Sequence, residues 1–444
     1  MVFEIENILG KKFKCEDCGR VHRIDIKGIE YGNLEEIGSF IRKKFKNDKK
    51  KVLLLCDNII WEIYGKKIKR ELRDFITTSC VLTPKNENRV TARYEYLEEI
   101  YKNLDGKNLI LTVGSGTITD LGKLAGYIEK IPVISFPTAP SMNGYTSPVS
   151  AYIKDGIKIT VPVKPPEYVY IDKMVISQAP IELIKSGFAD SLAKGFANAD
   201  WKISSILTNE NYCSLPLKIV NKAEKKYINK GEKILKRDVK TIQNLMEGLN
   251  FGGISMIIAG SSSPASGGEH LISHFLDMYT SQKKMEPFDY HGLQVGTGVF
   301  FSSLIYEKLR KIERFDIEKR LLERKIDYDK KLEKLVNLFF LSKEHLEKIF
   351  KNKLKLLKEI KRKLPENWEK IKKDCFSIVN SSEKIKKILE NARCPYHLKQ
   401  ICDNKNLIYD TLELSRFIRE RITILDIADE IGILYEVIEN YMEK

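Results

Sequence analysis

The chain has 444 residues, 43% of them hydrophobic, and a formal net charge of +15, so it is too long for one ordinary core and predicts two domains. It contains no run of about 18 apolar residues and no charged-then-apolar leader, so we expect a cytoplasmic protein without signal peptide or membrane span. The positive charge would suit nucleic acid, but no nucleic-acid-binding motif accompanies it and its lysines alternate with glutamates, so we expect no nucleic-acid partner.

The first 30 residues form a segment of their own, in which "CEDCGRVH" supplies Cys15, Cys18 and His22. Two cysteines separated by two residues can hold zinc, but a closed structural site needs a fourth ligand, and the chain has no second pair of this spacing. The alternative is a glycine-containing hairpin turn with free thiols. The scattered positions of the eight cysteines favour reduced thiols over a disulfide framework. We expect a Cys-containing hairpin over residues 1–30 and leave both roles open.

Residues 51–175 alternate short apolar runs with amphipathic stretches. Apolar runs of this length, closed by Asp, Gly or Pro, are typical of buried parallel strands in an α/β sheet. The runs are "KVLLLCDN", "CVLTP", "NLILTVGSGT", "IPVISFPTAPS" and "YVYIDKMVI". The segment therefore predicts a Rossmann-like nucleotide-binding domain over residues 1–176.

A glycine-containing turn follows the third run, in "LILTVGSGTITDLGKLAGY". Small residues let the backbone approach a diphosphate, and the first N–H groups of the following helix attract its charge. The alternative is a turn that is glycine-rich only for tight packing, because the stretch is not a full G-x-G-x-x-G. The residues predicted to bind the cofactor here are Gly114, Ser115, Gly116, Thr117, Ile118, Thr119 and Asp120.

Two further segments are predicted to line the same site. Asp57 closes the first strand, where its carboxylate can accept hydrogen bonds from a ribose and repel a 2′-phosphate, which favours NAD over NADP. The loop "FPTAPSMNGYTSP" is dense in small hydrogen-bonding side chains, which predicts cofactor and substrate contacts. These side chains are Thr138, Ser141, Asn143, Thr146 and Ser147.

From about residue 178 the pattern changes to long amphipathic helices, so we expect an all-α domain over residues 177–444. His270 and His274 stand four residues apart in "SGGEHLISHFLDM", the spacing that places two imidazoles on one helix face. They are either a metal pair or two packed side chains, and the spacing alone does not choose between them. The basic helical stretch 303–390 carries no functional interpretation.

Three stretches in order, "GSGTITD", "FPTAPSMNGYTS" and "SGFADSLAK...SSPASGGEHLISH...DYHGLQVG", together resemble the sn-glycerol-1-phosphate dehydrogenase family. That family belongs to the dehydroquinate synthase-like and iron-dependent alcohol dehydrogenase superfamily. The C-terminal "RFIRERITILDIADEIGIL" is similar to the bacterial branch. The resemblance spans residues 35–444 and implies a nicotinamide-binding domain followed by a helical metal-binding domain, in a homodimer.

The resemblance also implies the reaction and its residues: reduction of dihydroxyacetone phosphate, a small phosphorylated substrate, to sn-glycerol 1-phosphate with NADH or NADPH. It also implies one divalent metal, either zinc or nickel, with iron as a further candidate. The positions that match the family's metal ligands are Asp190, His270 and His291. His274 matches a substrate residue and is our candidate for proton relay, its alternative being a packed structural histidine. Lys194, one turn after Asp190, is a candidate for holding the phosphate.

Two positions depart from the pattern of the family. Asn143 stands where many relatives carry Asp and cannot take a proton at neutral pH, although it can hydrogen-bond a hydroxyl. Ser263 stands where relatives often carry Arg. These departures leave the exact substrate open. Three alternative functions are a glycerol or other polyol dehydrogenase, a dehydroquinate synthase-like cyclase, and a binding protein that has lost activity, although retention of Asp190, His270, His291 and His274 argues against the last. The metal carboxylate argues against the cyclase, because cyclases resemble one another in using Glu there.

Overall fold

The computed structural model describes residues 5–45, 51–85 and 88–443, so the first residues of the predicted N-terminal extension lie outside the described part. The chain forms two compact units. The first comprises residues 1–154, 158–191 and 218–261, and the second comprises residues 155–157, 192–217 and 262–444. The strands of the sheet end close to the predicted boundary at 176/177, but several helices that follow it belong to the unit that contains the sheet.

A six-stranded sheet with the order β3-β10-β7-β6-β4-β5 forms the centre of the first unit, and every neighbouring pair is parallel. All five apolar runs of the sequence form strands of this sheet, which confirms the predicted α/β fold. The strands are β3 Gly28–Tyr31, β4 Lys51–Asp57, β5 Ile76–Leu82, β6 Leu109–Gly114, β7 Val133–Pro137 and β10 Tyr168–Ile171.

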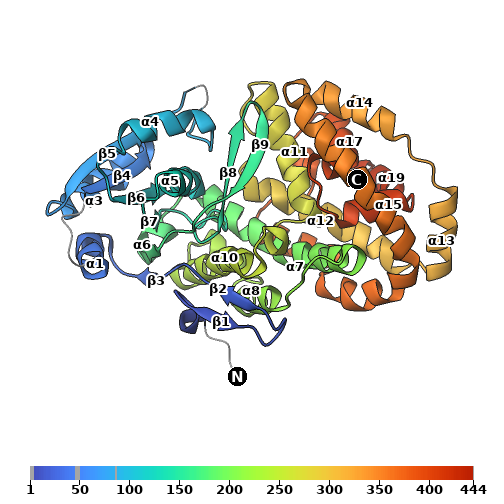
Figure 1. Cartoon of the computed structure of the whole chain (residues 1–444), viewed down its shortest axis with the longest axis horizontal. Coiled ribbons are helices and arrows are strands. Elements are labelled where there is room, and N and C mark those ends of the chain that lie inside the picture. Colours follow the sequence, from blue (N-terminus) through green and yellow to red (C-terminus); the bar gives the residue numbers. More distant parts are fainter. Residues whose placement is uncertain (1–4, 46–50, 86–87, 444) are drawn as a thin grey trace. The chain divides into compact units, whose positions relative to one another are not determined.

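Helices cover both faces of the sheet (Figure 1). Alternate residues of a strand point to opposite faces. In β4, Leu54 packs in the core under α1, α3 and α6, whereas Leu53 and Leu55 pack in the core under α4 and α5. Burial on both faces explains why the inner strands β10, β7, β6 and β4 are almost continuously apolar. The helices are α1 Ile37–Lys44, α2 Asn58–Ile60, α3 Lys66–Glu71, α4 Leu97–Lys102, α5 Gly116–Ile128 and α6 Lys173–Ser177.

Two antiparallel hairpins and four further helices complete this part of the chain. The first hairpin pairs β1 with β2, and the second pairs β8 with β9. Helix α7 begins in the first unit and continues into the second. The elements are β1 Lys12–Lys14, β2 Val21–Arg23, β8 Val149–Lys154, β9 Ile157–Pro162, α7 Ile181–Thr208, α8 Leu215–Glu224, α9 Gly231–Leu235 and α10 Val239–Ala259.

The second unit is built from helices, as the amphipathic pattern predicted. Its C-terminal part buries a group of charged side chains: Arg416 and Asp429 are both fully buried and joined at 2.7 Å. None of the helices in the described ranges is both long and apolar enough to cross a membrane. The helices are α11 Gly268–Gln282, α12 His291–Arg310, α13 Arg314–Glu323, α14 Tyr328–Leu338, α15 Lys343–Asp374, α16 Ser382–Asn391, α17 Lys405–Leu414, α18 Ile424–Glu430 and α19 Leu434–Met442.

Candidate cofactor and metal site

Asp57 and Gly114 end neighbouring strands at the same level. β4 and β6 are parallel, their last pair in register is Leu55 with Thr112, and Asp57 and Gly114 each follow two residues further along. Asp57 accepts a hydrogen bond from the backbone N–H of Ile60 at 2.8 Å. Burial raises the pKa of the Asp57 carboxyl, and this hydrogen bond opposes the shift. The structure therefore brings the predicted ribose acceptor beside the predicted diphosphate turn.

The glycine turn leads directly into helix α5. Ser115 is extended and precedes the first helical residue, Gly116. A Cβ at Gly116 would lie 2.5 Å from the side chain of Met142, so any larger residue here would require Met142 to move. Ser115 and Thr117 are partly exposed, whereas Ile118 is buried in the core. A small-residue turn at the start of a 13-residue helix fits a diphosphate, with contacts from backbone N–H groups and the partly exposed hydroxyls.

Lys123 is a fully buried residue that organises the predicted cofactor loop. Its Nζ donates to the carbonyl oxygens of Gly144 at 2.7 Å and Val149 at 2.6 Å, and to Ser147 Oγ at 2.8 Å. It also lies 2.8 Å from Asp120. Burial raises the pKa of Asp120 and lowers that of Lys123, and their mutual attraction opposes both shifts. Lys123 therefore links Asp120 in α5 to Ser147 in the cofactor loop.

The same loop contacts the first turns of α7. Thr138 donates its backbone N–H to the carbonyl of Gly114 at 3.0 Å. Ser186 Oγ donates to the carbonyl of Ser141 at 3.2 Å. A Cβ at Gly187 would lie 1.8 Å from the carbonyl oxygen of Pro140, so the helix backbone touches the loop directly. The cofactor loop is therefore held one helical turn before Asp190.

Asp190, His270 and His291 come from three helices and meet. Asp190 lies within α7, His270 lies in the first turn of α11, and His291 is the first residue of α12. One ligand atom from each lies within 4.8 Å of those of the other two. Asp190 and His270 are buried, and His291 is partly exposed. One carboxylate and two imidazoles fit zinc, nickel or ferrous iron and leave coordination positions for a substrate.

Neighbouring side chains orient both imidazoles. His270 Nδ1 lies 2.8 Å from Oε1 of the fully buried Glu269, and this oxygen also accepts the backbone N–H of Gly267 at 2.7 Å. His291 Nδ1 lies 3.1 Å from Ser273 Oγ. A contact at Nδ1 turns Nε2 toward the ligand position, and a carboxylate partner makes the imidazole a better donor.

The remaining predicted substrate residues are placed as follows. The ring of His274 stacks on that of His291, with centroids 5.8 Å apart and planes 19° apart, and His274 is not one of the three convergent ligands. Lys194 is buried, and its Nζ donates to the carbonyl of Ala265 at 3.4 Å. Asn143 is partly exposed in the cofactor loop. Ser263 is buried, with Oγ 3.5 Å from a carboxylate oxygen of Glu210.

Sequence reasoning missed Lys123 and treated Glu269 only as a neighbour of His270. A signal existed for Lys123, because it interrupts an otherwise apolar helix three residues after an acid. No local signal existed for Glu269, because its bond to the adjacent imidazole depends on the shape of the loop before α11.

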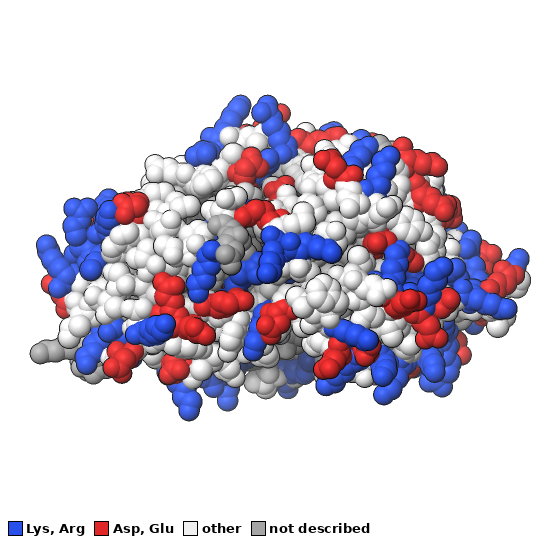
Figure 2. Space-filling view, turned by 90° about the horizontal axis from the view of Figure 1, so that it is seen from above, with Lys and Arg blue, Asp and Glu red and all other residues white. Residues whose placement is uncertain are grey.

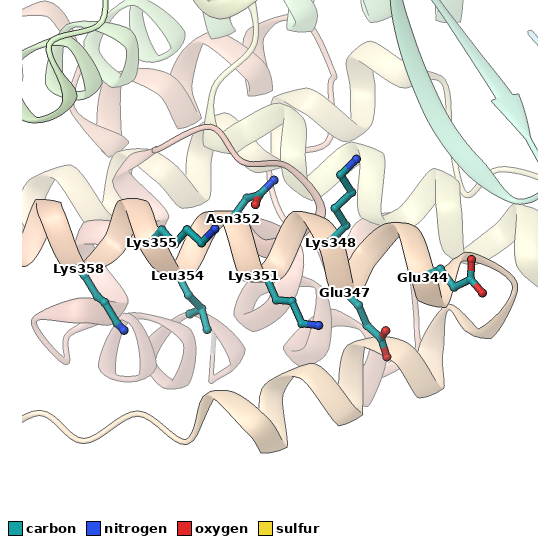
Figure 3. Close-up of a pocket in the computed structure, with 8 residues that line it drawn as sticks. All are labelled: Glu344, Glu347, Lys348, Lys351, Asn352, Leu354, Lys355 and Lys358. Atoms are coloured by element: carbon teal, nitrogen blue, oxygen red, sulfur yellow. The ribbon is translucent and has the colours of Figure 1, made fainter.

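The surface features in Figures 2 and 3 are weaker candidates for a catalytic site than this one. Figure 3 shows a hollow lined by eight residues of the single helix α15, most of them charged, with no histidine or cysteine among them. On the face shown in Figure 2, basic and acidic side chains are interspersed, so the positive net charge forms no uninterrupted basic area on that face.

The fold is shared with iron-containing alcohol dehydrogenases. The model of a family described as iron-containing alcohol dehydrogenase matches residues 28–180. Among solved structures, the iron-containing alcohol dehydrogenase of Thermococcus thioreducens shares the fold with a TM-score of 0.60 and 13% identity, covering 94% of this chain and 99% of that chain.

Curated relatives narrow the class. A protein of Bacillus velezensis named glycerol-1-phosphate dehydrogenase (NAD(P)+) is 35% identical over 278 residues, which cover 62% of this chain and 70% of that protein. A protein of Bacillus licheniformis with the same name is 32% identical over 301 residues, 66% of this chain and 74% of that protein. The chain therefore belongs to the glycerol-1-phosphate dehydrogenase family, as its motifs predicted.

Proposed function

We propose that this protein is a metal-dependent, NAD(P)-dependent sn-glycerol-1-phosphate dehydrogenase that reduces dihydroxyacetone phosphate. The convergence of Asp190, His270 and His291 carries the proposal, because it supplies the metal ligands that this reaction requires. The choice of substrate is based on the names of the relatives from Bacillus velezensis and Bacillus licheniformis. The Asp and His ligand set supports zinc or nickel, with iron as a further candidate, and we expect a cytoplasmic homodimer.

When bound, the metal polarises the carbonyl of the substrate and the nicotinamide supplies a hydride. In our proposal Asp190, His270 and His291 hold the metal, and Glu269 and Ser273 orient the two imidazoles. His274, stacked on His291, donates a proton to the substrate oxygen. Lys194 attracts the phosphate as a buried positive charge. Asn143 holds a hydroxyl of the substrate.

The cofactor is bound by two parts of the sheet edge. In our proposal the backbone at Gly114, Ser115 and Gly116, with the start of α5, holds the diphosphate. Asp57 accepts hydrogen bonds from the adenosine ribose, so NADH is preferred over NADPH because the carboxylate repels a 2′-phosphate.

One assay tests the substrate and the cofactor together. The purified protein is loaded separately with zinc, nickel or ferrous iron, and oxidation of NADH is followed with dihydroxyacetone phosphate and, in parallel, with dihydroxyacetone. We expect turnover that depends on the metal and on the phosphate. Equal efficiency with both substrates would identify a polyol dehydrogenase instead, the alternative that Asn143 and Ser263 keep open.

A further inference from the structure

The N-terminal hairpin presents three potential metal ligands in one turn. Cys15 directly follows β1, Cys18 lies in the turn, and His22 is the middle residue of β2, paired with Phe13. The backbone N–H of Cys15 donates to Arg20 and that of Gly19 donates to Cys15, both at 2.8 Å. These bonds fold the turn so that Cys18 Sγ lies 3.2 Å from His22 Nε2.

Gly19 allows this turn to close directly after the second cysteine. Its φ is +69°, in the left-handed region that glycine adopts at little cost. The turn thus brings the sulfurs of Cys15 and Cys18 near the imidazole of His22. A hairpin of two three-residue strands does not by itself require this arrangement.

A fourth potential ligand is Cys213, which sequence reasoning did not find because it lies almost 200 residues away. It stands two residues before the start of α8 and is buried. An ion pair joins Asp17 in the turn to Lys218 in α8, five residues after Cys213. One ligand atom from each of Cys15, Cys18, His22 and Cys213 lies within 4.8 Å of all the others.

We propose that Cys15, Cys18, His22 and Cys213 form a structural zinc site, separate from the metal site of the proposed reaction. Three thiolates and one imidazole are a donor set that zinc prefers. With Zn–S bonds of about 2.3 Å, tetrahedral ligands lie about 3.8 Å apart, so the observed group needs only small shifts to close on an ion. Four protein ligands leave no open position, so the site is structural and not catalytic.

The burial of the ligands supports a zinc ion as the centre of this hairpin. Cys15, His22 and Cys213 are 2%, 7% and 1% exposed, whereas most other hairpin residues from Lys11 to Arg23 are exposed or partly exposed. A hairpin this short has too little apolar area to be stable alone. A zinc ion would fasten it to the segment before α8 and so fix the approach to β3, the edge strand of the sheet.

The test is the zinc content of the full chain, purified under reducing conditions without chelators. We expect Asp190→Ala to keep one zinc ion per chain at the hairpin, while Cys18→Ala loses that ion. Cys18 is the partly exposed ligand, so its replacement disturbs packing least. Cys18→His keeps a zinc donor and should retain the ion. Cys402→Ala, at a buried cysteine outside the group, is the matched control.

Cobalt(II) provides a second measurement that needs no substitution in the hairpin. Asp190→Ala protein reconstituted with cobalt should show thiolate-to-cobalt charge transfer and the absorption of a tetrahedral ion. Zinc content that is equal in Asp190→Ala and the Asp190→Ala/Cys18→Ala double variant would overturn the proposal. So would a cobalt spectrum without thiolate bands. Zinc content and the cobalt spectrum do not depend on turnover, so they test this proposal separately from the proposed function.

Discussion

His270 and His274 share one side of α11, but their neighbouring side chains suit them to different roles. Glu269 lies against His270 Nδ1, and the ring of His274 stacks on His291. We predict that His274→Ala keeps the metal but lowers turnover by about 10² to 10⁴, the usual contribution of a proton donor. Metal content, melting temperature and turnover are measured on the same sample. Rescue of turnover by excess metal would instead make His274 a ligand, and a lower melting temperature with normal turnover would make it a packing residue.

Glu269 gives a second prediction at the scale of one residue. Glu269→Gln preserves the shape of the side chain and an oxygen that can accept from Gly267, but removes the negative charge beside His270. We expect the affinity for the catalytic metal to fall by about tenfold or more, as for other partners of ligating histidines. Titration with zinc against a competing chelator measures the change. Glu182→Gln, at an exposed position on α7, should leave the affinity unchanged.

At the scale of elements, Lys123 joins α5 to the loop that precedes β8. We predict that Lys123→Met lowers the free energy of unfolding by about 3 to 5 kcal/mol, because Asp120 is left buried without its partner. The Asp120→Asn/Lys123→Met double variant should be more stable than this single variant, because it removes the isolated charge. Denaturant unfolding followed by circular dichroism measures both, with the exposed Lys102→Met as control. A double variant less stable than Lys123→Met would contradict this explanation.

The elements also show how far the sequence could be interpreted. The four inner strands β10, β7, β6 and β4 were predictable because burial on both faces makes their sequences almost continuously apolar, whereas the edge strand β3 was not among the predicted runs. The glycine turn was predictable because its residues are contiguous. The bonds of Lys123 to the loop, and the approach of Cys213 to Cys15, were not predictable. Those contacts join segments far apart in the chain, and nothing in either segment alone specifies its partner. The metal ligands were inferred from a resemblance to a family, since the spacing of His270 and His274 did not distinguish a metal pair from two packed side chains.

At the scale of the whole molecule, acid stability depends on the charges buried in the C-terminal part. Asp429 lies 2.7 Å from Arg416, 2.9 Å from Arg324 and 3.1 Å from Lys331. Burial alone would raise the pKa of Asp429, but these cations outweigh it and lower the pKa from 3.8 to about 2. The charged form therefore stabilises the fold by about 2 kcal/mol above pH 4, and this contribution is lost as the pH falls through about 2.

We predict that Asp429→Asn is less stable than the parent by about 3 to 5 kcal/mol at pH 7. The difference between the two proteins should shrink between pH 4 and pH 2, because only the parent loses a charge there. Melting temperatures across this range measure the effect, with Asp403→Asn at an exposed position as control. A constant difference from pH 7 to pH 2 would show that Asp429 does not carry the acid dependence.

The contacts of helix α7 fix the number of residues between Gly187 and Asp190. Ser186 and Gly187 fix the rotation of this helix against the cofactor loop, and Asp190 follows within one turn. Each residue of an α-helix advances the direction of the side chain by about 100°. One inserted residue between Gly187 and Asp190 would therefore turn the metal carboxylate, and Lys194 after it, away from their positions while leaving the helix intact. The spacing between loop contact and ligand thus tolerates substitution far better than insertion or deletion.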